Sequence, residues 1–347
     1  MKTMINCVVN ILIFALLNGC SKNHSVSTTP PNTGGDTTHQ STPVNTDVAF
    51  WLTNSDQSAL FKKQNVSLLF SNSTNVNPTI IFDSTQTFQT MDGFGFALTG
   101  GSAYVINRMP ATDRDALLKE LFATDTNNIG ISYLRVSIGA SDLSADVFTY
   151  DDMPAGQTDT LLSNFSIAAE NADLIPVLQK IIAINSSIKI LGSPWTAPVW
   201  MKDNNSSVGG NLNHKYDDVY AKYFVKYIQA MQAKGITIDA VTLQNEPMNP
   251  NNNPSMLLSA AEEADFIKNH VGPAFKTAGI NTKIFIFDHN CGNPEYPLAI
   301  LADTSALKYI DGSAFHLYGG DISALTQIHN AAPSKNVYFT EQWVGAP

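Results

Sequence analysis

The sequence predicts an α/β protein built on a (β/α)8 TIM barrel, preceded by a short region of β-strands. From residue 91 onward, apolar runs alternate with segments of helical periodicity, and seven such β/α units in a row indicate a parallel sheet. Polar or charged residues follow nearly every strand, as in a barrel active site. A doubly wound sheet is the alternative, but no G-x-G-x-x-G pattern follows the early strand at 93–98.

The barrel domain is predicted over residues 91–347. Its strands are expected at seven places: 93–98, 132–138, 188–193, 240–244, 283–287, 313–317 and 337–340. The eighth strand of a complete barrel would follow Pro347, so we expect the barrel of this chain to be incomplete. Before the barrel, residues 46–90 contain three β-type runs, at 48–52, 66–70 and 79–82, with no helix between them.

Helices are expected between the barrel strands. Apolar residues repeat at three and four positions from Tyr220 to Met231, and Gly235 closes this helical pattern. Capping boxes predict two further helix starts, one at Thr112 with Asp115 and one at Ser259 with Glu262.

The first 45 residues are predicted to lie outside the folded body. Residues 1–19 are typical of a signal peptide, with an apolar run too short to span a bilayer. The sequence Leu-Asn-Gly-Cys ending at Cys20 resembles a bacterial lipoprotein box and predicts lipidation of Cys20; a secretory signal with a chance cysteine is the alternative. Residues 20–45 are rich in Ser, Thr, Pro, Asn and Gly, which predicts a disordered tether. We therefore expect lipid anchoring at the bacterial cell envelope, on the periplasmic or outer-membrane surface.

Composition narrows the class of ligand. The formal net charge is -10 and the pI is about 5.0, and no long Lys/Arg run is present, so nucleic-acid binding is not expected. A neutral ligand suits this chain best. We expect no cofactor and no metal, because Asp288-His289-Asn290-Cys291 and His316 do not have the spacing of a zinc site.

Two carboxylates follow predicted strands on facing sides of the barrel mouth. Glu246 comes after the fourth strand in Gln-Asn-Glu-Pro, and Glu341 comes after the seventh in Thr-Glu-Gln-Trp. Glycoside hydrolysis uses such a pair, an acid for the leaving oxygen and a carboxylate for the anomeric carbon. The alternative is that each Glu only pairs with a neighbouring cation. Because the acid must be protonated, we expect burial or the second carboxylate to raise its pKa.

Arg135 lies within the apolar strand at 132–138. Buried arginines are normally paired, so Arg135 is a candidate support for Glu341. A purely structural ion pair is the other interpretation.

Four segments resemble glycoside hydrolase family 30, in the same order along the chain. They are 192–202 (Gly-Ser-Pro-Trp-Thr-Ala-Pro-Val-Trp-Met-Lys), 244–247 (Gln-Asn-Glu-Pro), 315–318 (Phe-His-Leu-Tyr) and 340–343 (Thr-Glu-Gln-Trp). The resemblance implies a retaining mechanism, with Glu246 as acid/base and Glu341 as nucleophile. It also implies a side β-sandwich, with residues 46–90 as its N-terminal strands.

The resemblance also implies a set of sugar contacts. Asp142 would accept hydrogen bonds from sugar hydroxyls, Trp195 would offer an apolar ring face, and Asn245 would bond the 2-hydroxyl. A helix cap, core packing and a turn are the respective alternatives. His316 and Tyr318 complete the predicted substrate-binding residues, and Tyr318 is expected to hydrogen-bond to the nucleophile.

The substrate expected is a β-linked polysaccharide or oligosaccharide. Residues 94–102, 288–291 and 316–322 resemble the β-1,6-glucanase branch of the family, whereas Leu317 stands where glucosylceramidases usually carry Trp. We predict a retaining endo-β-1,6-glucanase; the alternatives are a glucosylceramidase-like β-glucosidase and a xylan-acting hydrolase. A different class is a non-catalytic glycan-binding lipoprotein, because an unclosed barrel exposes two sheet edges. The presence of both carboxylates argues against it.

Overall fold

The computed structural model describes residues 46–72, 74–125 and 128–343, in two units that divide between Thr90 and Met91. The predicted signal peptide (1–19), the tether (20–45) and the lipidation site Cys20 lie outside the described residues. Within the described ranges, no helix has the length and apolar character needed to cross a membrane.

The first unit contains a small antiparallel sheet in which β1 (Trp51–Leu52) pairs with β2 (Lys62–Lys63). The expected strands at 66–70 and 79–82 are wrong, because neither run is a strand in the described structure. A β-type sequence becomes a strand only where another strand takes up its backbone hydrogen bonds. The apolar side chains of Ile80, Ile81 and Phe82 are exposed, and the described residues of this unit do not form a sandwich by themselves.

The second unit is built on a curled parallel sheet whose strands follow the order of the chain. The seven predicted strands are all present: β3 (Gly95–Ala97), β4 (Tyr133–Ser137), β5 (Lys189–Ser193), β6 (Ala240–Thr242), β7 (Lys283–Asn290), β8 (Ile310–His316) and β9 (Asn336–Glu341). Each strand pairs in parallel with the next. In the described part of the chain β3 and β9 do not pair with each other, so the expected incomplete barrel is confirmed.

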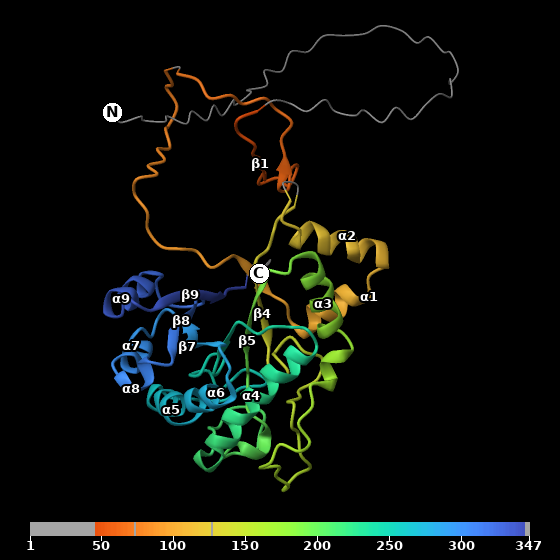
Figure 1. Ribbon diagram of the computed structural model, residues 1–347, viewed down its shortest axis with the longest axis vertical. Helices are drawn as coiled ribbons and strands as arrows, with labels where there is room; N and C mark the ends of the chain where they lie inside the picture. Colours follow the sequence, from red (N-terminus) through yellow and green to blue (C-terminus); the bar gives the residue numbers. More distant parts are fainter. Residues whose placement is uncertain (1–45, 73, 126–127, 344–347) are drawn as a thin grey trace, which may run out of the picture. The chain divides into compact units, whose positions relative to one another are not determined.

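The helices lie around the outside of this sheet (Figure 1). They are α1 (Gly100–Arg108), α2 (Ala111–Phe122), α3 (Leu174–Ile184), α4 (Asp217–Ala233), α5 (Ala260–Phe266), α6 (Gly272–Ala278), α7 (Glu295–Leu301), α8 (Thr304–Leu307) and α9 (Ser323–Ala331), with the π-helix η4 (Ile267–Val271) between α5 and α6. Three short 3-10 helices complete the unit: η1 (Ala168–Asn171), η2 (Val199–Met201) and η3 (His214–Tyr216).

One of the two predicted capping boxes is present. The Ser259 hydroxyl accepts from the backbone N–H of Glu262, and the Glu262 carboxylate accepts from the backbone N–H of Ser259. The box predicted at Thr112 is wrong, because α2 already begins at Ala111 and its first turn closes on the carbonyl of Pro110. Thr112 therefore lies within the helix and cannot be its N-cap.

Helix α4 shows how the outer core is formed. Its apolar repeat turns Tyr220, Tyr223, Phe224 and Tyr227 inward, and all four side chains are buried. Burying a large apolar side chain stabilises a fold by about 1.5–3 kcal/mol. Burial of this face therefore holds α4 against the sheet. Gly235 follows with φ of +77°, a backbone conformation that favours glycine.

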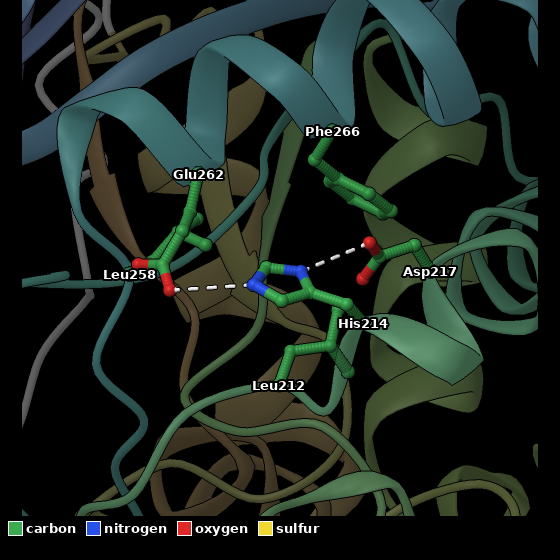
Figure 2. A pocket seen from close by; sticks show the side chains of 6 residues that line it. All are labelled: Leu212, His214, Asp217, Leu258, Glu262 and Phe266. Atoms are coloured by element: carbon green, nitrogen blue, oxygen red, sulfur yellow. Dashed lines mark hydrogen bonds and ion pairs between the residues drawn. The ribbon is translucent and has the colours of Figure 1, made fainter.

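A small hollow lies between η3 and α5, and its lining residues come from helices and loops rather than strand ends (Figure 2). The His214 ring lies between two carboxylates, with Nδ1 3.1 Å from Asp217 and Nε2 3.8 Å from Glu262. Burial raises the pKa of Asp217. The ring thus ties the start of α4 to the first turn of α5, and we assign this hollow to packing.

Candidate active site

The site is a layer of polar side chains directly above an apolar layer inside the barrel. The apolar layer contains four fully enclosed residues from β5, β6, β7 and β8, with a tyrosine from β4 and another from β9 beside them: Leu191, Ala240, Phe285, Ala314, Tyr133 and Tyr338. Alternate residues of a strand point to the same side. Two positions further along, the same strands therefore direct inward Arg135, Ser193, Thr242, His316 and Thr340, all of which share hydrogen-bonding partners.

Strand β7 departs from this alternation, and the departure puts Asp288 into the site. The register shifts between Phe287 and His289, and Phe287 and Asp288 have φ of +78° and +52°. Such a bulge re-aims the side chains that follow it. Phe287 packs outward against Tyr296 and Phe315, while Asp288 takes the inward place that strict alternation gives to residue 287.

Asp288 is the centre of the polar layer. Its fully buried carboxylate accepts hydrogen bonds from five side chains: Arg135 (2.7 Å), Ser193 (2.7 Å), Thr242 (2.9 Å), His316 (3.0 Å) and Thr340 (2.6 Å). Burial by itself would raise the pKa of Asp288, but the positive charges of Arg135 and His316 hold that pKa well below its usual range. Asp288 is thus a fixed negative charge that orients two cations.

Glu341, the last residue of β9, faces the mouth beside one of these cations. One carboxylate oxygen accepts from Arg135 Nη1 at 2.7 Å, and the other accepts from the Tyr318 hydroxyl at 3.1 Å. Arg135 was a candidate support for Glu341, and a hydrogen bond from Tyr318 to this residue was expected; the structure has both contacts. Arg135 also pairs with Asp288 at 2.7 Å, so the arginine is at once a structural ion pair and a support for Glu341.

Glu246 follows β6 in a left-handed backbone conformation, with φ of +46°. His316 Nδ1 lies 3.2 Å from its Oε1, and the amides of Asn249 and Asn252 donate to its Oε2 at 2.8 and 3.0 Å. The expectation of a raised pKa for Glu246 is wrong. Burial acts in that direction, but the hydrogen bonds from His316 and Asn249 outweigh it and lower the pKa of Glu246 to about 2.

His316 has a different place from the one predicted. Its side chain is fully buried, with one ring nitrogen beside Glu246 and the other beside Asp288. No surface of the ring is left for a sugar, so the predicted substrate contact of His316 is wrong. Burial opposes a charged imidazole, but Asp288 and Glu246 raise the pKa of His316 above its ordinary value, and the ring therefore acts on Glu246 as a cationic donor.

The two predicted catalytic glutamates meet across the mouth. A carboxylate oxygen of Glu246, one of Glu341 and a ring nitrogen of His316 lie within 4.8 Å of one another. Retaining glycosidases hold their two carboxyl groups about 5–5.5 Å apart, whereas inverting enzymes leave about 6.5–9.5 Å for a water molecule. An approach of carboxylate oxygens within 4.8 Å is nearer to the retaining separation than to the inverting one.

Comparison with protein families agrees with this geometry. Residues 91–347 match the model of the glycosyl hydrolase family 30 TIM-barrel domain. The chain belongs to glycoside hydrolase family 30.

Relatives within the family include glucanases and glucosylceramidases. An endo-1,6-β-D-glucanase of Neurospora crassa is 42% identical over 266 residues, which are 74% of this chain and 54% of that protein. The lysosomal acid glucosylceramidase of Mus musculus is 32% identical over 75% of this chain and 52% of that protein. A solved endo-β1,6-glucanase matches with a TM-score of 0.77 and 40% identity, over 86% of this chain and 65% of that one. This chain spans about half the length of the curated relatives it matches.

The other predicted sugar contacts of this family 30 chain lie around the glutamate pair. Trp195 is buried below Arg135, whose guanidinium carbon is 4.9 Å from the ring centroid. The side-chain oxygen of Asn245 accepts from Arg135 at 2.7 Å. Asp142 is exposed as a residue, but desolvation of its carboxyl group and the charges of Glu341 and Glu246 raise the pKa of that group.

Three residues of the family 30 site were missed by the sequence prediction: Asp288, Asn249 and Asn252. Asp288 was considered only as a metal ligand, which was rejected, and as part of a run typical of one branch, because regular alternation does not direct it inward. Asn249 and Asn252 lie in an Asn-rich loop, and such a composition predicts turns rather than contacts with a particular carboxylate. Their proximity to the Asn-Glu-Pro motif is the signal that could have found them.

One further group, outside the mouth, has the spacing of possible metal ligands: Asp217, Asp265 and His270, with atoms within 4.8 Å of one another. His270 also has its other ring nitrogen 2.7 Å from Asp218. The contacts of the His270 ring with Asp217, Asp218 and Asp265 account for this spacing, so we assign no metal to it.

Proposed function

We propose that this chain is a retaining endo-β-1,6-glucanase that works by double displacement. The observation that carries the proposal is the pair of carboxylates within 4.8 Å, one held by Arg135 and Tyr318 and the other by His316. Support for the linkage comes from the relatives named endo-1,6-β-D-glucanase, which share 36–42% identity with this chain, against 31–33% for those named glucosylceramidase.

The proposed first step joins the sugar to the protein. Glu341 attacks the anomeric carbon while Glu246 gives a proton to the leaving glycosidic oxygen, so one C–O bond forms as another breaks. Arg135 and Tyr318 orient the attacking carboxylate. In the second step Glu246, now ionised, takes a proton from water, and the water oxygen displaces Glu341 with overall retention of configuration.

The acid/base role is tested with Glu246→Gln on a panel of β-1,6-, β-1,3- and β-1,4-glucans and xylan. We expect wild type to cleave β-1,6-glucan fastest and the variant to lose about 10²–10⁴-fold in kcat/KM on it. A dinitrophenyl β-glucoside, whose leaving group needs no proton, should form the glycosyl ester in the variant at nearly the wild-type rate, seen as a burst of dinitrophenol.

Other outcomes of this panel would redirect the assignment. Cleavage of xylan with β-1,6-glucan untouched would favour a xylan-acting hydrolase, and release of glucose from a glucosylceramide alone would favour a glucosylceramidase-like activity. Binding of β-1,6-glucan without hydrolysis by wild type would favour the glycan-binding lipoprotein.

We further propose that Cys20 carries a lipid that anchors the chain at a bacterial envelope. The Leu-Asn-Gly-Cys sequence and the polar segment after it support this proposal. Expressed in a bacterium with radiolabelled palmitate, the wild-type chain should be labelled and should sediment with membranes, whereas Cys20→Ser should be unlabelled. An unlabelled wild-type chain released without its first residues would instead point to an ordinary secretory signal.

A further inference from the structure

We propose that Asn249 and Asn252 are positioning residues that reserve Oε1 of Glu246 for proton transfer and set the upper pH limit of glucan cleavage. We call these two side chains the amide clamp. The inference rests on the proposed function, in which Glu246 is the acid/base. Both asparagines lie in the loop that follows β6.

The two donors of the amide clamp share a single acceptor. Asn249 and Asn252 both donate to Glu246 Oε2, at 2.8 and 3.0 Å. A carboxylate oxygen offers about two lone-pair positions, so Oε2 has none left for a proton. Oε1 has one hydrogen-bonding partner, His316 at 3.2 Å, and keeps one lone-pair position free. The acidic proton must therefore be carried on Oε1.

The direction of Oε1 agrees with that assignment. The His316 nitrogen that lies 3.2 Å from Glu246 Oε1 also lies 3.9 Å from Glu341 Oε1. Oε1 thus faces the space between the two glutamates, where the anomeric carbon and its leaving oxygen must be. Oε2 faces the loop, and its two amide partners keep the carboxyl group from rotating.

The loop that carries the amide clamp is firmly held. The backbone N–H of Asn249 donates to the carbonyl of Glu246 at 2.8 Å. Further along, the Ser255 hydroxyl donates to the carbonyl of Pro250 at 3.0 Å, and the buried Lys202 ammonium donates to the carbonyl of Ser255 at 2.7 Å. The amides are therefore placed by the fold and do not need the substrate to bring them in.

Charged and titratable side chains surround Glu246 from several strands: Arg135 on β4, Asp288 and His289 on β7, His316 and the nearby Tyr318 at the end of β8, Glu341 on β9, and Asp142 in the loop after β4. His316 favours the ionised carboxylate, while the carboxylates of Glu341 and Asp142 oppose it. The two neutral donors of the amide clamp also stabilise the ionised form of Glu246. The amide clamp thus keeps Glu246 ionised for the second step and lowers the pH below which Glu246 is protonated for the first step.

The test is the pH profile of kcat/KM for the double variant Asn249→Ala/Asn252→Ala. Because two donors to the ionised form are lost, the alkaline limb on β-1,6-glucan should move upward by about one pH unit. On dinitrophenyl β-glucoside the limb should not move, because that substrate needs no acid. Each single variant should move it by about half as much, which covers the case in which the double variant does not fold.

Asn251→Ala, an exposed neighbour in the same loop, is the matched control and should keep the wild-type profile. An unchanged limb in folded single variants, with Glu246→Gln still inactive on glucan, would overturn the amide clamp and leave the proposed function standing. A Glu246→Gln variant with wild-type rates would instead overturn the proposed function itself.

Discussion

Replacing Glu341 with Gln should reduce kcat/KM on β-1,6-glucan by about 10⁴-fold or more, because loss of a catalytic nucleophile has costs of this order in other enzymes. Gln keeps the size of the side chain and can still contact Tyr318, but its amide cannot form the glycosyl ester. Rates of glucan cleavage by wild type and variant, measured under the same conditions, give the comparison.

Two controls separate chemistry from folding in Glu341→Gln. The variant should unfold at a similar urea concentration, because Arg135 keeps its ion pair with Asp288. A 2-deoxy-2-fluoro-glucosyl inhibitor should add its mass to Glu341 of the wild type and should not label the variant. Attachment of the label to another residue, or a variant retaining a tenth of wild-type activity, would contradict the double-displacement assignment.

Replacing Asp288 with Asn should damage both stability and activity. Removal of one partner from a buried ion pair costs about 3–5 kcal/mol, and Arg135 and His316 would then be two buried cations without their shared carboxylate. Their loss of orientation should lower kcat/KM by about 10²-fold. Urea unfolding and glucan hydrolysis of the purified variant measure the two effects.

The free energy of unfolding should depend on pH through Asp288 and His316, in opposite directions. Asp288 has a lowered pKa in the folded chain, so its contribution is present above the ordinary Asp pKa of about 3.9 and is lost as the pH falls towards the folded value. His316 has a raised pKa, so its contribution is complete below about pH 6.5 and is lost as the pH rises through the folded value. Asp288→Asn should remove the first dependence and weaken the second, because Glu246 still contacts His316.

Asp115→Asn is a suitable control for Asp288→Asn. Asp115 contacts Arg114 and Lys180 on the surface, where ion pairs contribute little because water screens them. The control should unfold at the wild-type urea concentration. An Asp288→Asn variant with unchanged unfolding would show that the polar layer does not depend on this carboxylate.

The amino-acid pattern alone was sufficient to predict the barrel strands and to place Glu246 and Glu341 together at the barrel mouth. Strands β4 to β9 are apolar runs bounded by polar residues, and such runs predict buried parallel strands wherever they fall in the chain. Glu246 and Glu341 were found because each directly follows such a run, and a parallel barrel brings all those strand ends to one face. Arg135 was a candidate because a buried arginine is normally paired, and Tyr318 came from the resemblance to family 30.

Tertiary structure alone decided the protonation state of the site and the identity of its supporting residues. The bulge that turns Asp288 inward reflects positive φ angles at Phe287 and Asp288, which are uncommon for any residue except glycine, so no local pattern predicts the bulge. The lowered pKa of Glu246 depends on donors from β8 and from the Asn-rich loop, and such a shift is a property of three-dimensional neighbours. Outside the bulge in β7, sequence periodicity determines which strand residues reach the mouth of the barrel. The charge that each one carries there depends on contacts between chain segments far apart in sequence.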